Sequence, residues 1–111
     1  MYYNGECVEQ SYEEAFKWYK KAADQGLDNA QYVIGLMYLD GEGVKQDYKE
    51  AFNWCKKAAE QGLAQAQYNI GTMYINGHGV EQNYEEAIKW VKKAADQGYE
   101  EAKKALKKLN S

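Results

Sequence analysis

Apolar and polar positions in this chain follow a pattern that repeats every 36 residues. The tryptophans show it most simply, because Trp18, Trp54 and Trp90 are separated by equal intervals of 36 residues. Tyrosine, alanine, glycine and methionine recur at the same offset. A unit copied in this way buries its apolar face only against its neighbours, so the pattern predicts an array of stacked repeats.

One amphipathic helix of each unit is easy to recognise, and we call it the B helix. From residue 48 onward, apolar residues stand at i, i+3, i+4, i+7, i+10 and i+11, which is one face of a helix. Asp47 is placed to cap the first turn, with Glu50 reaching back, and Gly62 is placed to end the helix. The same capping position holds Ser11 in the first copy and Asn83 in the third.

The second helix of each unit, the A helix, is predicted at residues 28–40 and 64–76. Each has a glycine in its middle, which costs roughly 1 kcal/mol relative to alanine in a helix. We expect this cost to be offset by a close approach of two helix axes, in which Gly35 and Gly71 contact Ala51 and Ala87 of the B helix that follows.

The helices are predicted to follow one another as a stub and then B-A-B-A-B-A. The first five residues align with the end of an A helix, and the last A helix has no B helix after it. The chain, residues 1–111, is therefore predicted to be one all-α domain of helix-turn-helix repeats. Its repeat frames are about 1–27, 28–63 and 64–99, followed by a capping helix at 100–110.

Charge and hydropathy exclude several function classes. Asp and Glu outnumber Lys and Arg by 17 to 14, which argues against electrostatic binding of nucleic acid or of an anionic membrane. No apolar run approaches the roughly 20 residues of a membrane span, and no secretory leader is recognisable. We expect a soluble chain, of unspecified compartment, whose start at Met1 is also compatible with a cut within a longer protein. The chain has one basic cluster, which consists of Lys103, Lys104, Lys107 and Lys108. It is interpreted as a solvated capping face, with a nucleic-acid or acidic-peptide contact as the alternative.

Catalytic side chains are scarce. The chain has one histidine, two serines and one threonine, which leaves no nucleophile and base for a triad. His78 occupies a turn position that holds Glu42 in the preceding copy, so we interpret it as a solvated side chain. No calcium-loop or phosphate-loop motif is present. We therefore predict no enzyme activity, no metal and no cofactor.

The two cysteines occupy different positions of the repeat, which is not the arrangement of a disulfide or metal-binding set. Both are predicted to be free thiols, with Cys55 in a small hydrophobic role on its helix. Cys7 stands where Gly43 and Gly79 stand in the other copies. If those glycines adopt a positive φ, then either Cys7 is strained or its loop has shifted.

Two motifs recur along the chain. The first, from Ala66 to Val80, reads A-x-x-x-x-G-x-x-Y-x-x-G-x-G-V, and the second, from Tyr84 to Ala95, reads Y-x-x-A-x-x-W-x-x-x-A-A. Over essentially the whole chain this resembles the Sel1-like repeat family, relatives of the tetratricopeptide repeats. The resemblance implies a right-handed α-solenoid with A helices along a concave face. It also implies an adaptor that holds proteins together in signalling, quality control or bacterial host interaction. A β-lactam-related activity has been proposed for some cysteine-rich members, whose paired cysteines this chain lacks.

The tetratricopeptide comparison places Tyr32 and Tyr68 on the groove side of the A helices. Tyrosine offers broad apolar area, few rotatable bonds and a hydrogen bond to a peptide backbone. We therefore predict a non-catalytic interaction scaffold that docks a peptide or helix of a partner protein in this groove. The predicted groove residues are Asn29, Tyr32, Leu36, Leu39, Asp40, Gln65, Tyr68, Thr72, Ile75, Asn76, Glu101 and Lys104.

Two other functions stay open. A designed or self-assembling module would have uniform groove residues, whereas Leu36 and Asp40 are replaced by Thr72 and Asn76 in the next copy. A hydrolase would need a pocket that holds a nucleophile and a base, which the chain does not offer.

Self-association is a separate question. The first B helix, at about 12–25, lacks most of its A partner, so we expect a monomer that associates weakly through apolar surface at its N-terminal end. That surface is predicted around Ala15, Phe16, Tyr19 and Ala22.

Overall fold

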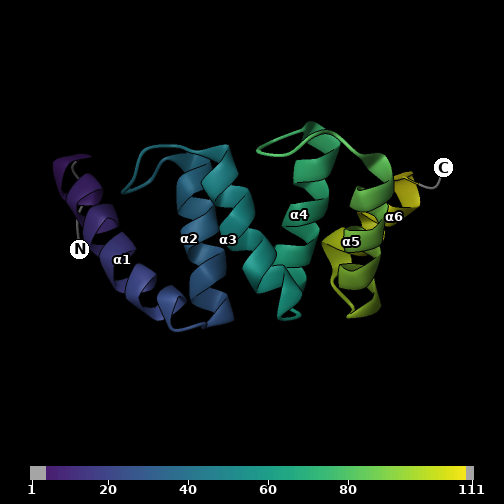
Figure 1. The fold of residues 1–111 in the computed structure, drawn as a ribbon, viewed down its shortest axis with the longest axis horizontal. Helices are drawn as coiled ribbons and strands as arrows, with labels where there is room; N and C mark the ends of the chain where they lie inside the picture. The colour runs from purple at the N-terminus through teal and green to yellow at the C-terminus, as the bar shows by residue number, and fades with distance from the viewer. Residues whose placement is uncertain (1–4, 110–111) are drawn as a thin grey trace.

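The computed structural model describes the backbone of residues 5–109 and the side chains of residues 11–109. Within that range the chain forms six helices and no strand, which confirms the predicted all-α repeat fold. Each helix packs against the next one along the chain, and the helices stand in a row from one end of the 45 Å long axis to the other (Figure 1). The helices are α1 (Gly5–Asp24), α2 (Asp28–Asp40), α3 (Tyr48–Glu60), α4 (Ala64–Asn76), α5 (Tyr84–Asp96) and α6 (Glu100–Leu109).

The B helices α3 and α5 begin at the predicted capping residues, but the expected return contact from Glu50 does not form, because the N–H of Asp47 donates to the carbonyl oxygen of Tyr38 at 2.9 Å. The Asp47 carboxylate accepts hydrogen bonds from the backbone N–H groups of Lys49 and Glu50 at 3.0 and 3.1 Å. The Asn83 side chain accepts one from the N–H of Glu86 at 3.1 Å. Each cap satisfies N–H groups that have no partner within the first turn, so these two helices start where the sequence places them.

The first B helix differs from its prediction. It begins at Gly5 and not near Tyr12, so Ser11 lies inside α1 and does not cap it. The reason lies in the turn that precedes α3 and α5, where Gly43 and Gly79 both have a φ of +75°. Only glycine adopts this conformation readily.

Cys7 stands at the position of those glycines, and its backbone is helical. No residue other than glycine has a positive φ in the described part of the chain. The loop of the first copy has therefore shifted into helix, which is the second of the two outcomes expected for Cys7. The turn glycines also allow close packing, because a Cβ on Gly43 or Gly79 would collide with the carbonyl oxygen of Tyr12 or Tyr48 in the preceding B helix.

The mid-helix glycines bring α2 onto α3 and α4 onto α5, as predicted. A Cβ on Gly71 would lie 2.5 Å from Val91 Cγ2 and 3.2 Å from the carbonyl oxygen of Ala87. A Cβ on Gly35 would lie 3.2 Å from the carbonyl oxygen of Ala51. Helix axes this close leave no room for a side chain on α2 or α4 at these positions, and this explains the glycines.

Cys55 lies beneath Gly35 and is fully buried. It is a free thiol, as predicted, and burial raises its pKa to about 12. A thiol that stays protonated and inaccessible is a poor nucleophile, so Cys55 serves packing. The side chain of Cys7 lies outside the described residues.

The tryptophans occupy the same repeat position but differ in environment. Trp54 is 9% exposed and packs with Ala30, Ile34 and Met37 of α2. Trp90 is half-buried against the core between α3 and α4. Trp18 is 69% exposed. Trp54 and Trp90 therefore pack on the pair of helices that precedes them, whereas no such pair precedes α1 among the described residues.

Candidate functional site

The predicted groove residues all lie on the A helices α2, α4 and α6. None of them is buried, so each presents some surface to solvent. The exposed members are Asn29, Asp40, Gln65, Asn76, Glu101 and Lys104, and the half-buried members are Tyr32, Leu36, Leu39, Tyr68, Thr72 and Ile75.

The two tyrosines predicted to lie in the groove, Tyr32 and Tyr68, are less exposed than residues that only contact a partner would be. Tyr32 packs against the core between α3 and α4, where burial raises the pKa of its phenol and the nearby Tyr99 adds to the rise. The Tyr68 ring lies 5.6 Å from the ring of Tyr99. Tyr99 precedes α6 and was not among the predicted groove residues, because its position holds Leu27 and Leu63 in the other copies. Part of each groove tyrosine therefore belongs to the core.

A hollow of ≈ 420 Å³ lies where the C-terminal ends of α2 and α4 meet the start of α3, and we call it the central hollow. Four predicted groove residues line it together with four residues that were not predicted. The predicted members are Leu39, Asp40, Thr72 and Asn76, and the others are Gln46, Tyr48, Met73 and His78.

His78 is more ordered than its sequence position suggests. It is half-buried, and its ring stacks on Tyr48 with centroids 4.4 Å apart and planes 10° apart. The interpretation of His78 as a purely solvated side chain is therefore wrong. The turn that carries it packs on the first turn of α3, and this places the two rings face to face.

A pair of side-chain amides joins neighbouring units and was also missed. The Gln61 side-chain N–H₂ donates to Gln31 Oε1 at 2.7 Å and to the carbonyl oxygen of Gly26 at 2.9 Å. Since Gln31 is buried, these hydrogen bonds satisfy a polar group that would otherwise destabilise the fold. Gln97, Gln67 and Gly62 form the same set at 2.9 and 2.8 Å.

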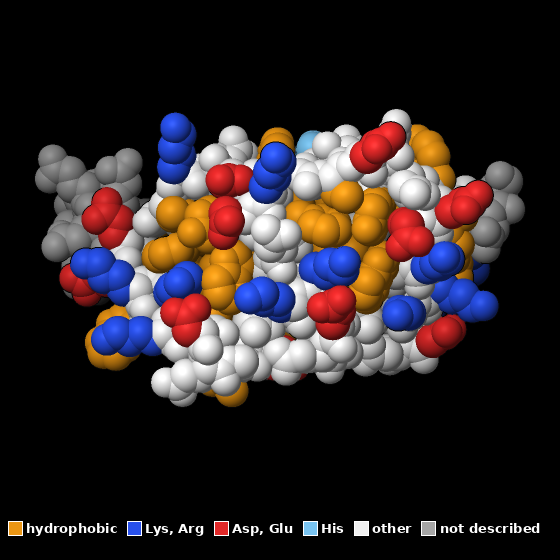
Figure 2. All heavy atoms as spheres, viewed as in Figure 1, with side chains coloured by type: hydrophobic (Ala, Val, Ile, Leu, Met, Phe, Trp, Pro, Cys, Tyr) orange, Lys and Arg blue, Asp and Glu red, His pale blue; other side chains and the backbone are white. Residues whose placement is uncertain are grey.

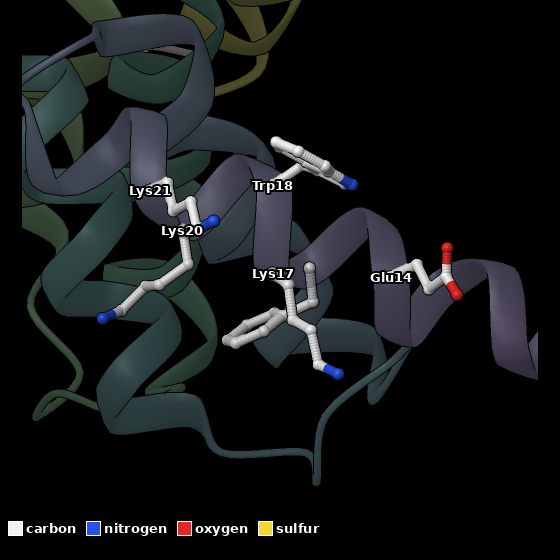
Figure 3. Close-up of a pocket in the computed structure, with 6 residues that line it drawn as sticks. Glu14, Lys17, Trp18, Lys20 and Lys21 are labelled. Atoms are coloured by element: carbon white, nitrogen blue, oxygen red, sulfur yellow. The ribbon is translucent and has the colours of Figure 1, made fainter.

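The N-terminal end of the array carries an open apolar surface. Tyr19 on α1 is 42% exposed, whereas Cys55 and Val91 at the same repeat position are fully buried. Phe16 is half-buried, because its ring packs edge-on against Tyr38 at 5.5 Å. Trp18 projects from α1 beside a hollow of ≈ 490 Å³ that Lys17, Lys20 and Lys21 also line (Figure 3).

Lysines border much of the hydrophobic surface. Figure 2 shows hydrophobic side chains gathered in patches, with basic and acidic side chains around them. Several lysines lie over aromatic rings, among them Lys57 Nζ at 4.7 Å from the Trp54 ring and Lys93 Nζ at 4.5 Å from the Trp90 ring. By contrast, α2 and α4 contain no lysine or arginine. The A helices of the first two complete units are thus free of basic charge.

Within the described residues, no three His, Cys, Asp or Glu side chains come together as metal ligands. In residues 5–109, no helix combines the length and the hydrophobicity that a membrane span requires.

The chain is similar to several known proteins. A family model described as Sel1 repeat matches residues 1–27, 28–63 and 64–99. The chain is 46% identical to a Sel1 repeat protein from Oxalobacter formigenes, with a TM-score of 0.81 over 85% of this chain and 38% of that one. It is 47% identical to c5321, a protective antigen of uropathogenic Escherichia coli with an SLR fold, with a TM-score of 0.78 over 78% of this chain and 19% of that one. Helicobacter pylori cysteine rich protein B is 28% identical, with a TM-score of 0.78 over 82% of this chain and 68% of that one. The comparison with curated proteins gave no match.

Proposed function

This chain belongs to the Sel1 repeat family, and on that premise we propose that it docks a peptide or helix of a partner protein in the groove lined by α2, α4 and α6. Proteins of this family are generally non-catalytic interaction scaffolds. In this proposal the three A helices line the concave face of a right-handed solenoid. The chain spans 38% and 19% of the first two relatives, so it corresponds to only part of such proteins.

The observation that carries the proposal is the environment of the groove residues. All twelve retain solvent-accessible surface, although they lie on helices whose other faces form the core. Tyr32 and Tyr68 are held by packing, so little side-chain entropy is lost when a ligand covers their free surface. The groove also varies from copy to copy, which suits recognition of one partner sequence better than architecture alone.

Replacing Tyr32 and Tyr68 together with alanine is expected to weaken peptide binding by roughly 2–4 kcal/mol, as loss of contact hot spots does. The ligands are peptides selected from a random library on the folded chain, and affinity is measured by calorimetry. Tyr84→Ala is the matched control, because this tyrosine is 55% exposed on α5, outside the groove. Equal affinity for the double variant and the control would remove the groove assignment.

Both groove tyrosines also contact the core, so a second variant guards against loss of folding. Asn29→Arg with Gln65→Arg changes two exposed residues on α2 and α4. The helical circular dichroism signal should stay unchanged, while the bulk of the two arginines blocks the groove. Peptides that bind this variant as tightly as the native chain would contradict docking at the A helices.

We also propose that the chain is a monomer in dilute solution that associates weakly through α1. The exposed rings of Trp18 and Tyr19 are the supporting observation, since a soluble protein gains free energy by covering such surface. Light scattering should show a mass that rises with concentration, and Tyr19→Glu should abolish the rise. Tyr84→Glu serves as the control. A tight dimer that Tyr19→Glu leaves intact would place the contact elsewhere.

A further inference from the structure

Asp40, which lines the central hollow, lies at a position where a positive charge would stabilise the fold. It is the last residue of α2, and the C-terminal end of a helix is stabilised by a cation. The helices α1, α3, α5 and α6 each have a lysine in the last turn, whereas α2 and α4 have none, and of these two only α2 ends in an acidic residue. Among the residues whose side chains the structure describes, Asp40 forms no ion pair. Its negative charge is therefore not neutralised within the described part of the chain.

The surroundings of Asp40 are also suited to a cation. The central hollow has no lysine or arginine in its lining. One wall is the stacked pair of Tyr48 and His78, and Tyr48 remains 39% exposed. The faces of aromatic rings attract cations. The Thr72 hydroxyl donates to the carbonyl oxygen of Asn69 at 2.8 Å, so its oxygen is left to act as an acceptor.

We propose that the central hollow binds the guanidinium group of an arginine side chain of the partner, an inference that rests on the proposed docking function. Arginine fits better than lysine for two reasons. Its planar fork matches a carboxylate such as that of Asp40 with two hydrogen bonds, and its flat face stacks on an aromatic ring, here an outer face of the Tyr48–His78 pair. The ≈ 420 Å³ hollow has room for this group, and it lies along the groove that would hold the peptide backbone.

The test uses the full chain and a blocked peptide, acetyl-Gly-Arg-Gly-amide, followed by NMR titration of backbone amides. Amide signals of Asp40, Thr72 and His78 are expected to shift on binding. The peptide in which citrulline replaces arginine keeps the shape but loses the charge, and it should bind at least about tenfold more weakly. A lysine peptide should fall between the two.

Asp40→Asn separates binding from stability. Asparagine stands at the equivalent position in the next copy, as Asn76, so the fold accepts it. This variant should bind the arginine peptide at least about tenfold more weakly, yet unfold at the same or a slightly higher temperature. Asp96→Asn is the control, because Asp96 is the exposed last residue of α5 and does not line the hollow. It should change the unfolding temperature in the same direction and leave peptide affinity unaltered.

Three results would overturn the proposal. The first is equal binding of the citrulline or the lysine peptide, and the second is unchanged affinity in Asp40→Asn. The third is a set of library-selected peptides that bind the groove but share no arginine, in which case docking stands and the arginine site fails. If the library yields no groove binder at all, the docking function fails instead, whatever the blocked arginine peptide does.

Discussion

Replacing Trp54 with alanine is expected to lower the free energy of unfolding by roughly 3–5 kcal/mol, the range for a large aromatic side chain lost from a core. Trp54 is 9% exposed, and it packs against Ala30, Ile34 and Met37 of the preceding A helix. Lys20 of α1 and Lys57 of its own helix approach the ring at 5.5 and 4.7 Å. Truncation would leave a cavity between units, and in an array this weakens the contact that couples one repeat to the next.

Trp18→Ala is the matched control for this change. Trp18 holds the same repeat position, but it is 69% exposed, so its truncation should cost less than about 1 kcal/mol. Urea denaturation of the three proteins, followed by circular dichroism, measures the two differences. A loss below about 1 kcal/mol for Trp54→Ala, or equal losses at the two sites, would show that the tryptophans do not bridge the layers.

These two tryptophans also show what periodicity predicts and what it cannot. The 36-residue pattern located α2 and α4 to the residue, because glycines and apolar faces mark both ends and the inner side of each helix. The same pattern treats Trp18 and Trp54 as equivalent. Their burial differs because it depends on the neighbouring unit. The order of the helices predicted an open face on the first B helix, but it did not predict that Trp18 would be exposed.

The first helix was misjudged for a related reason. The turn before each later B helix depends on a glycine with a φ of +75°, and Cys7 replaces that glycine in the first copy. The sequence showed the conflict but not its resolution, since a strained turn and a continued helix were both compatible with it. In the structure the helix continues back to Gly5.

The candidate site was predicted in part. Asp40 and Asn76 were placed in the groove by family resemblance, and the structure brings both into the central hollow. Tyr48 and His78 were missed because they lie 30 residues apart, on a B helix and a turn, and no local pattern links them. The glutamines that join neighbouring units do recur every 36 residues. A signal was therefore present, but polar residues at regular spacing look like a solvated helix face until their partners are known.

Replacing Gly71 with leucine is expected to lower the free energy of unfolding by about 3 kcal/mol, at the upper end of the usual cost of overpacking. Even a Cβ at this position would lie 2.5 Å from Val91 Cγ2 and 3.2 Å from the carbonyl oxygen of Ala87. Val91 is fully buried and β-branched, so its side chain has little freedom to move aside, and the backbone of α5 cannot yield without moving the helix. The gain in helix propensity, roughly 0.8 kcal/mol, offsets only part of this cost.

Thr72→Leu is the matched control, because the preceding copy already has Leu36 at this position. Thr72 is half-buried at the groove, so the change should stay within about 0.5 kcal/mol. Val91→Ala combined with Gly71→Leu provides a sharper test. If the clash with Val91 carries the cost, the double variant should be more stable than the sum of the two single losses predicts. Equal losses for Gly71→Leu and Thr72→Leu would show that the mid-helix glycines do not set the spacing between α4 and α5. Additive losses in the double variant would place the clash on the α5 backbone and not on Val91.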